Sequence, residues 1–358
     1  MKKKLLVLLY ALLIKNIAQS QIEHVIIITT DGFRWQELFS GVDTAIANNR
    51  RFNEGDSAII YKRYWDADPL QSRKKLLPFI WNELVKNGSI YGNRNAGNKV
   101  NLANPYWISY PGYSEIFTGY PDPQVNSNGF KPNPNITLFD FLNTQSKFKN
   151  KMAAFGAWDA FNRILNRQRN GLPIFSAFDT VTGKLTAQQK LINQMLTNSY
   201  RPWGSGECFD VFTHYAAMEY LKAHQPKVLF IGYGETDEWA HNAQYRSYLD
   251  AAHQFDQWLD EIWQYVQSSP LYKNKTALFI TTDHGRGDTI KSQWTSHGSS
   301  VKGADETWFM VIAPGLPAKG EVTTNGQYFT KQFAQTVAGL LGTTFKADHP
   351  IGEKIDLR

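Results

Sequence analysis

Five short segments that are apolar and rich in β-branched residues are spread along the chain. Segments of this kind, apolar throughout and not alternating with polar residues, are typical of strands buried on both faces of a parallel sheet. They therefore constrain the fold more than any other feature of the sequence. The segments lie at 24–29, 152–157, 227–232, 276–282 and 307–313, the second being the weakest.

Helical patterns lie between these segments. Between 244 and 268, apolar residues recur at spacings of three and four, and Pro270 ends the pattern. Strands alternating with helices predict an α/β fold, with a mostly parallel central sheet and helices on both faces. Further helices are expected near 74–87, 136–146, 187–198, 209–224 and 329–341.

Three of the predicted strands end next to residues that could bind a metal ion. Asp31 follows the first strand, Asp237 and His241 follow the third, and Asp283 and His284 follow the fourth. In open α/β sheets, ligands bind beyond the carboxyl ends of the strands. A lone aspartate at a strand end is commonly a helix cap, and a lone histidine commonly has a structural role. Their shared position, however, predicts one common site.

The local spacing also suits metal binding. Asp237 and His241 are four residues apart, so one helical turn would place both on the same side of a site. Gly285 follows His284 and allows close approach of the backbone. His297 lies in a turn-like Ser-His-Gly context. These residues together indicate chemistry more than a structural role.

Ser109 lies in an aromatic segment, and Pro111 just after it suits the first turn of a helix. Ser109 would then sit at a helix N-terminus, where backbone donors and the helix dipole favour an anion. A serine hydroxyl becomes a nucleophile only when a base or a metal lowers its pKa. The alternative, a helix cap, is compatible with that role.

The N-terminus has the features of a secretory signal peptide: three lysines, a ten-residue apolar run at 5–14 and a small-residue site after Ser20. The run is shorter than the ~20 residues of a membrane span, although an uncleaved anchor is the alternative. We expect cleavage after residue 20 and a secreted or periplasmic protein without a membrane span. The segment 1–20 carries four lysines and no acid, so its removal lowers the net charge from +6 to +2.

That weak charge gives no electrostatic basis for nucleic-acid binding. The single Cys208 cannot form an internal disulfide. We expect residues 21–358 to form a single domain. Within it, the region 40–108 contains polar stretches rich in Asn, Gly and Tyr, which suggest long loops or a small cap.

The chain resembles the alkaline phosphatase superfamily, and most closely its nucleotide pyrophosphatase/phosphodiesterase branch and related bacterial phosphatases. The resemblance extends over 30–297 and rests on motifs that occur in the same order as in that family. The motifs are Thr30-Asp-Gly-Phe-Arg34, Ser109-Tyr-Pro through Thr118-Gly119, Asp237 to His241, Thr282-Asp-His-Gly285 and His297.

This resemblance implies a hydrolase of small phosphate esters with two bound divalent metal ions. Histidine and carboxylate ligands suit zinc, with manganese or iron as alternatives. Ser109 would attack phosphorus and form a phosphoseryl intermediate. Water bound to the ion held by Asp237, His241 and His297 would then hydrolyse this intermediate. One ion would be bound by Asp237, His241 and His297, and the other by Asp31, Asp283, His284 and the Ser109 oxygen.

Three residues are candidates for substrate binding. By this resemblance we expect an asparagine donor three residues after the nucleophile, but Gly112 stands there. Backbone N–H groups or Arg286 would then stabilise the phosphoryl oxygens, although an exposed arginine without a role is an equal alternative. Tyr110 belongs to an aromatic neighbourhood suited to an apolar leaving group. Arg34 is expected to be a structural ion-pair partner.

Several functions compete. A phosphodiesterase is favoured slightly over a phosphomonoesterase, which would need positive side chains to bind a dianion. A sulfatase is disfavoured because the sequence after Ser109 lacks the formylglycine motif, and a phosphoglycerate mutase is disfavoured by the predicted export. A catalytically inactive, exported glycan- or surface-binding protein is the alternative from another class. Oligomeric state is left open.

Overall fold

The computed structural model describes residues 22–358, so the predicted signal peptide lies outside the described residues. Within them, an eight-stranded sheet has the order β10-β2-β9-β7-β1-β6-β4-β5, and a second sheet has the order β11-β3-β8. The strands are β1 (His24–Thr30), β2 (Ser89–Tyr91), β3 (Asn98–Asn101), β4 (Met152–Gly156), β5 (Ile174–Ser176), β6 (Val228–Tyr233), β7 (Thr276–Thr281), β8 (Glu306–Thr307), β9 (Phe309–Ile312), β10 (Gly320–Glu321) and β11 (Gly326–Phe329).

The large sheet is mostly parallel, as predicted. Strands β7, β1, β6, β4 and β5 all run in one direction, because each neighbouring pair among them is parallel. β9 runs antiparallel to both β7 and β2. The apolar run at 307–313 predicted a strand there, but a run that is apolar throughout does not reveal the direction of its strand.

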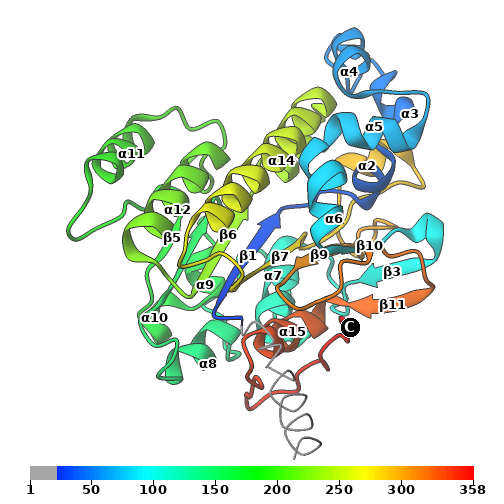
Figure 1. The fold of residues 1–358 in the computed structure, drawn as a ribbon. Helices are drawn as coiled ribbons and strands as arrows, with labels where there is room; N and C mark the ends of the chain where they lie inside the picture. The colour runs from blue at the N-terminus through cyan, green and yellow to red at the C-terminus, as the bar shows by residue number, and fades with distance from the viewer. Residues whose placement is uncertain (1–21) are drawn as a thin grey trace, which may run out of the picture.

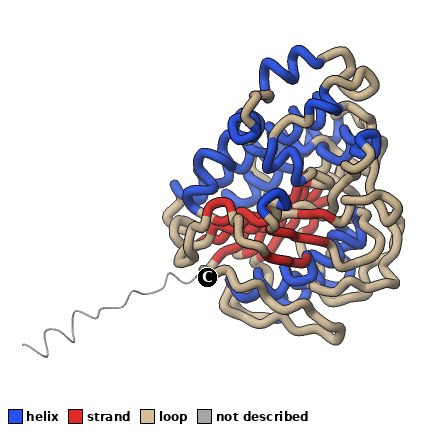
Figure 2. Tube along the Cα trace, turned by 90° about the vertical axis from the view of Figure 1, so that its right-hand side faces the viewer, coloured by secondary structure: helices blue, strands red, loops and turns tan. Residues whose placement is uncertain are grey.

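The sheet is buried on both faces, and consecutive residues of each central strand pack into different cores. On β1, Ile26 and Ile28 belong to one hydrophobic cluster, whereas Val25 and Ile27 belong to the other. This division explains why the strands are apolar throughout. Helices lie on both sides of the strands in Figure 2, and the predicted α/β fold is confirmed.

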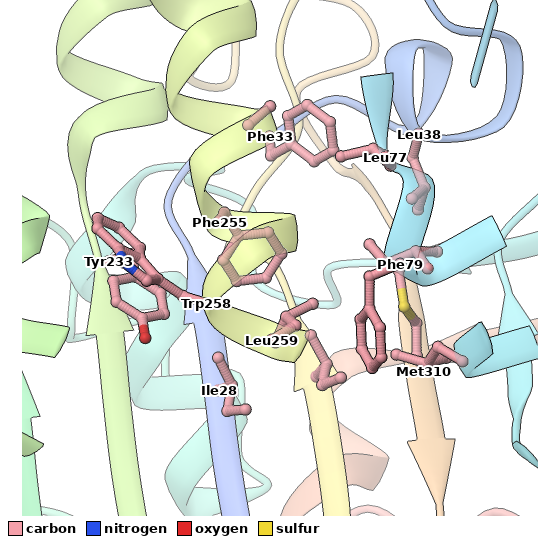
Figure 3. Packing of buried hydrophobic residues seen from close by; sticks show 14 of the residues in the cluster. Ile28, Phe33, Leu38, Leu77, Phe79, Tyr233, Phe255, Trp258, Leu259 and Met310 are labelled. Carbon is pink, nitrogen blue, oxygen red and sulfur yellow. The ribbon is translucent and has the colours of Figure 1, made fainter. Parts of the chain in front are cut away.

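The longest helix, α14, covers one face of the sheet. Its residues Phe255, Trp258 and Leu259 lie over Ile28 of β1, as Figure 3 shows, and all four belong to the same buried cluster. α14 spans Tyr245–Ser268, which agrees with the predicted helix at 244–268. The apolar spacing of three and four therefore reported the buried face of this helix correctly.

The other helices are distributed around the sheet (Figure 1). The predicted helices near 136–146, 187–198, 209–224 and 329–341 are confirmed with small changes at their ends. The helices are α2 (Trp35–Ser40), α3 (Thr44–Ala47), α4 (Ser57–Tyr64), α5 (Pro69–Leu76), α6 (Val85–Asn87), α7 (Ser109–Thr118), α8 (Leu138–Thr144), α9 (Phe161–Ile164), α10 (Arg167–Asn170), α11 (Ala187–Asn198), α12 (Asp210–His224), α13 (Glu235–His241) and α15 (Phe333–Leu340), with shorter turns η1 (Ile80–Leu84), η2 (Arg94–Ala96), η3 (Lys291–Thr295) and η4 (Thr330–Gln332).

The helix predicted over 74–87 is divided into α5, η1 and α6. Pro78 cannot donate a backbone hydrogen bond and disfavours helical geometry at Leu77. The carboxylate of Asp256 on α14 then accepts hydrogen bonds from Phe79 N at 2.7 Å and from Ile80 N at 2.8 Å. A new helical turn therefore begins against α14.

The region 40–108 contains helices and strands as well as loops. α3, α4 and α5 lie in its first half, and β2 and β3 lie in its second half, where they join the two sheets. In Figure 1, α3, α4 and α5 gather beyond one end of α14. Within residues 22–358, none of the helices combines the length and the apolar character needed to cross a membrane.

Candidate metal and nucleophile site

The predicted ligands lie together at one edge of the large sheet. Asp31 follows β1, α13 with Asp237 follows β6, and Asp283 follows β7. The order β7-β1-β6 makes these three strands neighbours. The shared position after a strand, which was the basis of the prediction from sequence, therefore corresponds to closeness in space.

One group of candidate ligands surrounds Asp237. His241 Nε2 lies 3.0 Å from Asp237 Oδ2 and 3.0 Å from His297 Nε2. His297 Nε2 lies 3.9 Å from Asp237 Oδ1. The spacing of four residues on α13 thus brings Asp237 and His241 to one point, and His297 joins them from the loop after η3.

A second group surrounds His284. Its Nε2 lies 3.3 Å from Asp31 Oδ1, 3.6 Å from Asp283 Oδ2 and 3.2 Å from Ser109 Oγ. The two groups adjoin each other, because His284 Nε2 is 3.7 Å from Asp237 Oδ1 and the His284 ring stacks on that of His297. The seven residues proposed as ligands therefore form one continuous cluster.

Hydrogen bonds to backbone carbonyls orient two of the histidines. His284 Nδ1 lies 2.9 Å from Gly285 O, and His297 Nδ1 lies 3.2 Å from Trp107 O. A ring nitrogen that donates to a carbonyl must carry the proton in the neutral imidazole. In both rings Nε2 is then an unprotonated nitrogen directed at the cluster, as a metal ligand requires.

The carboxylates also fit a cation. Asp31 Oδ1 and Asp283 Oδ2 are buried and accept no hydrogen bond. Burial and the nearby Asp237 raise the pKa of Asp31 well above its usual value, and burial together with Asp31 does the same for Asp283. Buried carboxylates that repel one another and each have one oxygen without a hydrogen-bond donor are stabilised by a bound cation. The donor set of histidine and aspartate suits a divalent metal such as zinc.

Gly32 allows the two groups to approach each other. Its φ of +57° lies in the left-handed region, and its N–H donates to Asp283 Oδ1 at 3.1 Å. A Cβ at this position would lie 2.5 Å from Asp237 Oδ1 and 3.0 Å from His284 Cε1. A larger residue would therefore collide with the ligands themselves.

Ser109 is the first residue of α7, a helix whose residues are all buried. Pro111 lies in the first turn, as predicted. The N-terminus of α7 is directed at the ligand cluster, because Ser109 Oγ is 3.2 Å from His284 Nε2. The dipole of this helix favours negative charge at the position of Ser109.

Tyr110 and Gly112, which the sequence suggested as substrate-binding residues, offer no side-chain donor to a substrate. Tyr110 is buried, and its hydroxyl donates to Lys131 O at 2.9 Å. The backbone N–H of Tyr110 donates to Asn128 Oδ1 at 3.0 Å. A Cβ on Gly112 would lie 2.4 Å from Asp283 O, so an asparagine at position 112 would force the backbone of α7 or of the Asp283 loop to move.

Asn128 is a candidate for the side-chain amide expected near Ser109. Its Oδ1 accepts from Tyr110 N in the first turn of α7, and its Nδ2 donates no hydrogen bond to another described residue. The sequence analysis missed this residue because it lies 19 positions after Ser109 in a polar loop. Only the tertiary contact with Tyr110 distinguishes it from the other asparagines of that region.

Trp107 was also missed as a positioning residue. Its φ of +53° is unusual for a bulky side chain. The Asn104 side chain holds this conformation by accepting from Trp107 N at 3.1 Å, and Asn104 N in turn donates to the buried Glu115 at 2.8 Å. The result is that the Trp107 carbonyl accepts from His297, two residues before the nucleophile.

Asp210 holds the N-terminus of α13. Its carboxylate accepts from Gly234 N at 2.7 Å and from Glu235 N at 2.9 Å. These donors have no partner within the helix, so Asp210 stabilises the start of the element that carries Asp237 and His241. An aspartate 25 residues before the first residue of the helix gives no signal of this contact in the sequence.

The two arginines differ in their surroundings. Arg34 is fully buried and pairs with Glu37, with further contacts to Asp43 at 3.6 Å and Asp288 at 3.4 Å, so the predicted structural ion pair is confirmed. Arg286 is only 1 % exposed, and the alternative of an exposed arginine is wrong. Its guanidinium contacts the carboxylate of Asp237.

That contact sets the charge of Asp237. Burial alone would raise the pKa of Asp237, but Arg286 and then His241 hold it well below its usual range. Burial and the nearby His284 lower the pKa of His297. Asp237 is therefore an anion and His297 is neutral, which is the state in which both can bind a metal ion.

Comparison with known proteins agrees with this geometry. A family model described as the Metalloenzyme superfamily matches residues 212–301, a segment that contains Asp237, His241, Asp283, His284 and His297. The wild-type alkaline phosphatase PafA is 11% identical with a TM-score of 0.60, over 94% of this chain and 98% of that chain. The fold is that of the alkaline phosphatase superfamily.

Other solved structures share this fold. The lipoteichoic acid synthase LtaP from Listeria monocytogenes is 12% identical with a TM-score of 0.56, over 92% of this chain and 74% of that chain. A putative sulfatase from Bacteroides thetaiotaomicron is 13% identical with a TM-score of 0.59, over 92% and 72%. No curated protein matches the sequence significantly. The alkaline phosphatase-like fold implied by the motifs is confirmed, and the match to the metalloenzyme model covers five of the seven proposed ligands.

Proposed function

We propose that this protein is an exported phosphoric ester hydrolase with two metal ions, which uses Ser109 as its nucleophile and prefers phosphodiesters. The observation that carries the proposal is the position of Ser109 Oγ, at the N-terminus of α7 and 3.2 Å from His284 Nε2. A hydroxyl placed between a helix N-terminus and a set of metal ligands is suited to attack an anionic phosphorus centre. We assign residues 21–358 to one catalytic domain.

The proposed ligands are those predicted from the sequence. Two divalent ions, when bound, would lower the pKa of the Ser109 hydroxyl and neutralise charge on the phosphoryl oxygens. One ion, which we expect to be zinc, would be held by Asp237, His241 and His297. The other would be held by Asp31, Asp283, His284 and Ser109.

The reaction then proceeds in two displacements at phosphorus. Ser109 loses its proton to solvent water, its Oγ forms a bond to phosphorus, and the bond to the leaving oxygen breaks as that oxygen takes up a proton from solvent. The N-terminus of α7 and the amide of Asn128 stabilise negative charge on the phosphoryl oxygens during this step. Water next attacks the phosphoseryl group from the side opposite Ser109, and the Ser109 oxygen leaves and regains a proton.

The position of Arg286 supports a diester over a monoester, because this arginine is not free to bind a phosphoryl oxygen. Arg286 already contacts Asp237. A monoester dianion needs positive side chains around it, whereas a diester carries one negative charge and tolerates this environment better.

The test is the kcat/KM for an aryl phosphate diester compared with an aryl phosphate monoester, measured on residues 21–358 loaded with zinc. We expect the diester to be preferred, and Ser109→Ala serves as the background. A preference for the monoester would contradict the assigned substrate class but retain the hydrolase. Stoichiometric metal without turnover of any ester would instead support an inactive binding protein.

A further inference from the structure

Arg286 connects three segments that carry or adjoin proposed metal ligands. It lies two residues after His284, in the loop after β7. Its Nη1 donates to the Asp237 carboxylate on α13. Its Nε donates to Trp294 O at 2.7 Å and its Nη2 to Thr295 O at 2.7 Å, so it also binds the segment that leads to His297.

These contacts fix the guanidinium group in one position. The two backbone carbonyls hold it from one side, and the Asp237 carboxylate holds it from another. A guanidinium is planar and rigid, and its hydrogen bonds to a carboxylate are charge-assisted. Because Arg286 occupies Asp237 Oδ1, the other oxygen, Oδ2, is the one that lies 3.0 Å from His241 Nε2.

The same contacts leave the group poorly placed for a substrate. Nε and both terminal nitrogens of Arg286 already donate to acceptors of the protein. Nη2 is additionally 3.4 Å from His241 Nδ1. With 1 % of the residue exposed, the side chain has little surface through which it could contact a phosphoryl oxygen.

We propose that Arg286 is a positioning residue for the metal ion bound by Asp237, His241 and His297, and not a ligand of the substrate phosphate. It orients the Asp237 carboxylate and fixes the loop before His297 relative to α13. The inference rests on the metal sites assigned under the proposed function. It reassigns the residue that the sequence suggested as a phosphate-binding arginine.

Arg286→Gln and Arg286→Lys test this proposal, with Arg34→Gln as the matched control. Arg34 is likewise a fully buried arginine that pairs with a carboxylate and donates to a backbone carbonyl, Gly287 O, but it contacts none of the proposed ligands. The metal content and the dissociation constant of each ion are measured by competition with a chelator, below the unfolding temperature of every variant. Inhibition by inorganic phosphate is measured on the metal-saturated proteins.

We expect Arg286→Gln to lower the affinity for one of the two metal ions by about 10–100-fold, which is the usual effect of losing a group that orients a metal ligand. The affinity for the other ion and the inhibition constant of phosphate stay unchanged. Arg286→Lys, which keeps a positive charge but cannot reach both carbonyls, falls between the wild type and Arg286→Gln. If Arg286→Gln does not fold, the metal affinity of Arg286→Lys is compared with that of the wild type. Arg34→Gln lowers thermal stability and leaves both metal affinities as in the wild type.

Two results would overturn the inference. If metal affinity is unchanged while inhibition by phosphate weakens tenfold or more, Arg286 is a phosphate ligand. If Arg34→Gln weakens one metal as much as Arg286→Gln does, the effect is general destabilisation and not positioning. A wild-type protein that binds no metal would refute the proposed function itself, which separates that failure from the failure of this inference.

Discussion

Gly112→Ala adds one methyl group between the nucleophile helix and a metal-ligand segment. Gly112 lies one turn into α7, and a Cβ there would be 2.4 Å from the backbone carbonyl of Asp283. A carbon atom normally keeps about 3.5 Å from its neighbours, so about 1 Å of overlap must be relieved. The obstacle is backbone, which cannot rotate away, so α7 or the Asp283 loop has to move.

Two opposing terms determine the outcome. Alanine is favoured over glycine in a helix by about 1 kcal/mol, whereas forcing a group into a packed interior costs about 1–3 kcal/mol and occasionally more. The net change in the free energy of unfolding is therefore a loss of about 0–2 kcal/mol. Activity suffers more, because a displacement of about 1 Å between reacting groups can lower the rate by about 100-fold.

The assay is kcat/KM on a phosphodiester together with thermal unfolding. Gly339→Ala is the matched control, because this helical glycine of α15 has only Lys354 Cδ, at 3.6 Å, near its Cβ position. We expect Gly339→Ala to be as active as the wild type and slightly more stable. Gly112→Ala should lose most of its activity with a small loss of stability. A Gly112→Ala protein that is stabilised and fully active would refute the packing of α7 against Asp283.

Three further predictions concern other parts of the structure. His241→Ala should reduce the metal content from two ions to one, because it removes a proposed ligand of one ion only; unchanged content in elemental analysis would contradict the assignment. Asn128→Ala should lower kcat/KM by about 10²–10³-fold, the usual effect of losing one donor to a developing oxyanion, with metal content unchanged; wild-type kinetics would remove Asn128 from the site. Burial raises the pKa of Asp256 to about 7, above its value of about 3.9 in the unfolded chain. The native state thus binds this proton more tightly, so the contribution of Asp256 to stability is greatest below about pH 4 and falls as the pH rises to about 7. Urea midpoints at about pH 5 and about pH 8 should therefore differ less in Asp256→Asn than in the wild type; an equal difference would show that another group dominates.

The central part of the fold was predictable because it depends on local patterns. Strands such as β1, buried on both faces, are apolar throughout, and α14 repeats its apolar residues with helical spacing. The antiparallel direction of β9 and the strands β2 and β10 at the sheet edge were not predictable. β2 and β10 are only three and two residues long, so their pairing depends on tertiary contacts and leaves no periodic signal.

The closeness of the proposed ligand residues was predictable for a similar reason. Asp31, Asp237 and Asp283 each follow a strand, and the topology of a parallel sheet brings such positions together. Asn128, Asp210 and the strained Trp107 act through single contacts across the fold. Their residue types are common in loops and helix caps, so no spacing in the sequence distinguishes them.

The most direct test of the account is to quench the enzyme with acid during turnover of a phosphodiester and to analyse its peptides by mass spectrometry. The account predicts a phosphoryl adduct on the peptide that contains Ser109. It also predicts that Ser109→Ala retains its metal but has neither the adduct nor turnover. Undiminished hydrolysis by Ser109→Ala, or an adduct on a different residue, would contradict the assignment of Ser109 as the nucleophile.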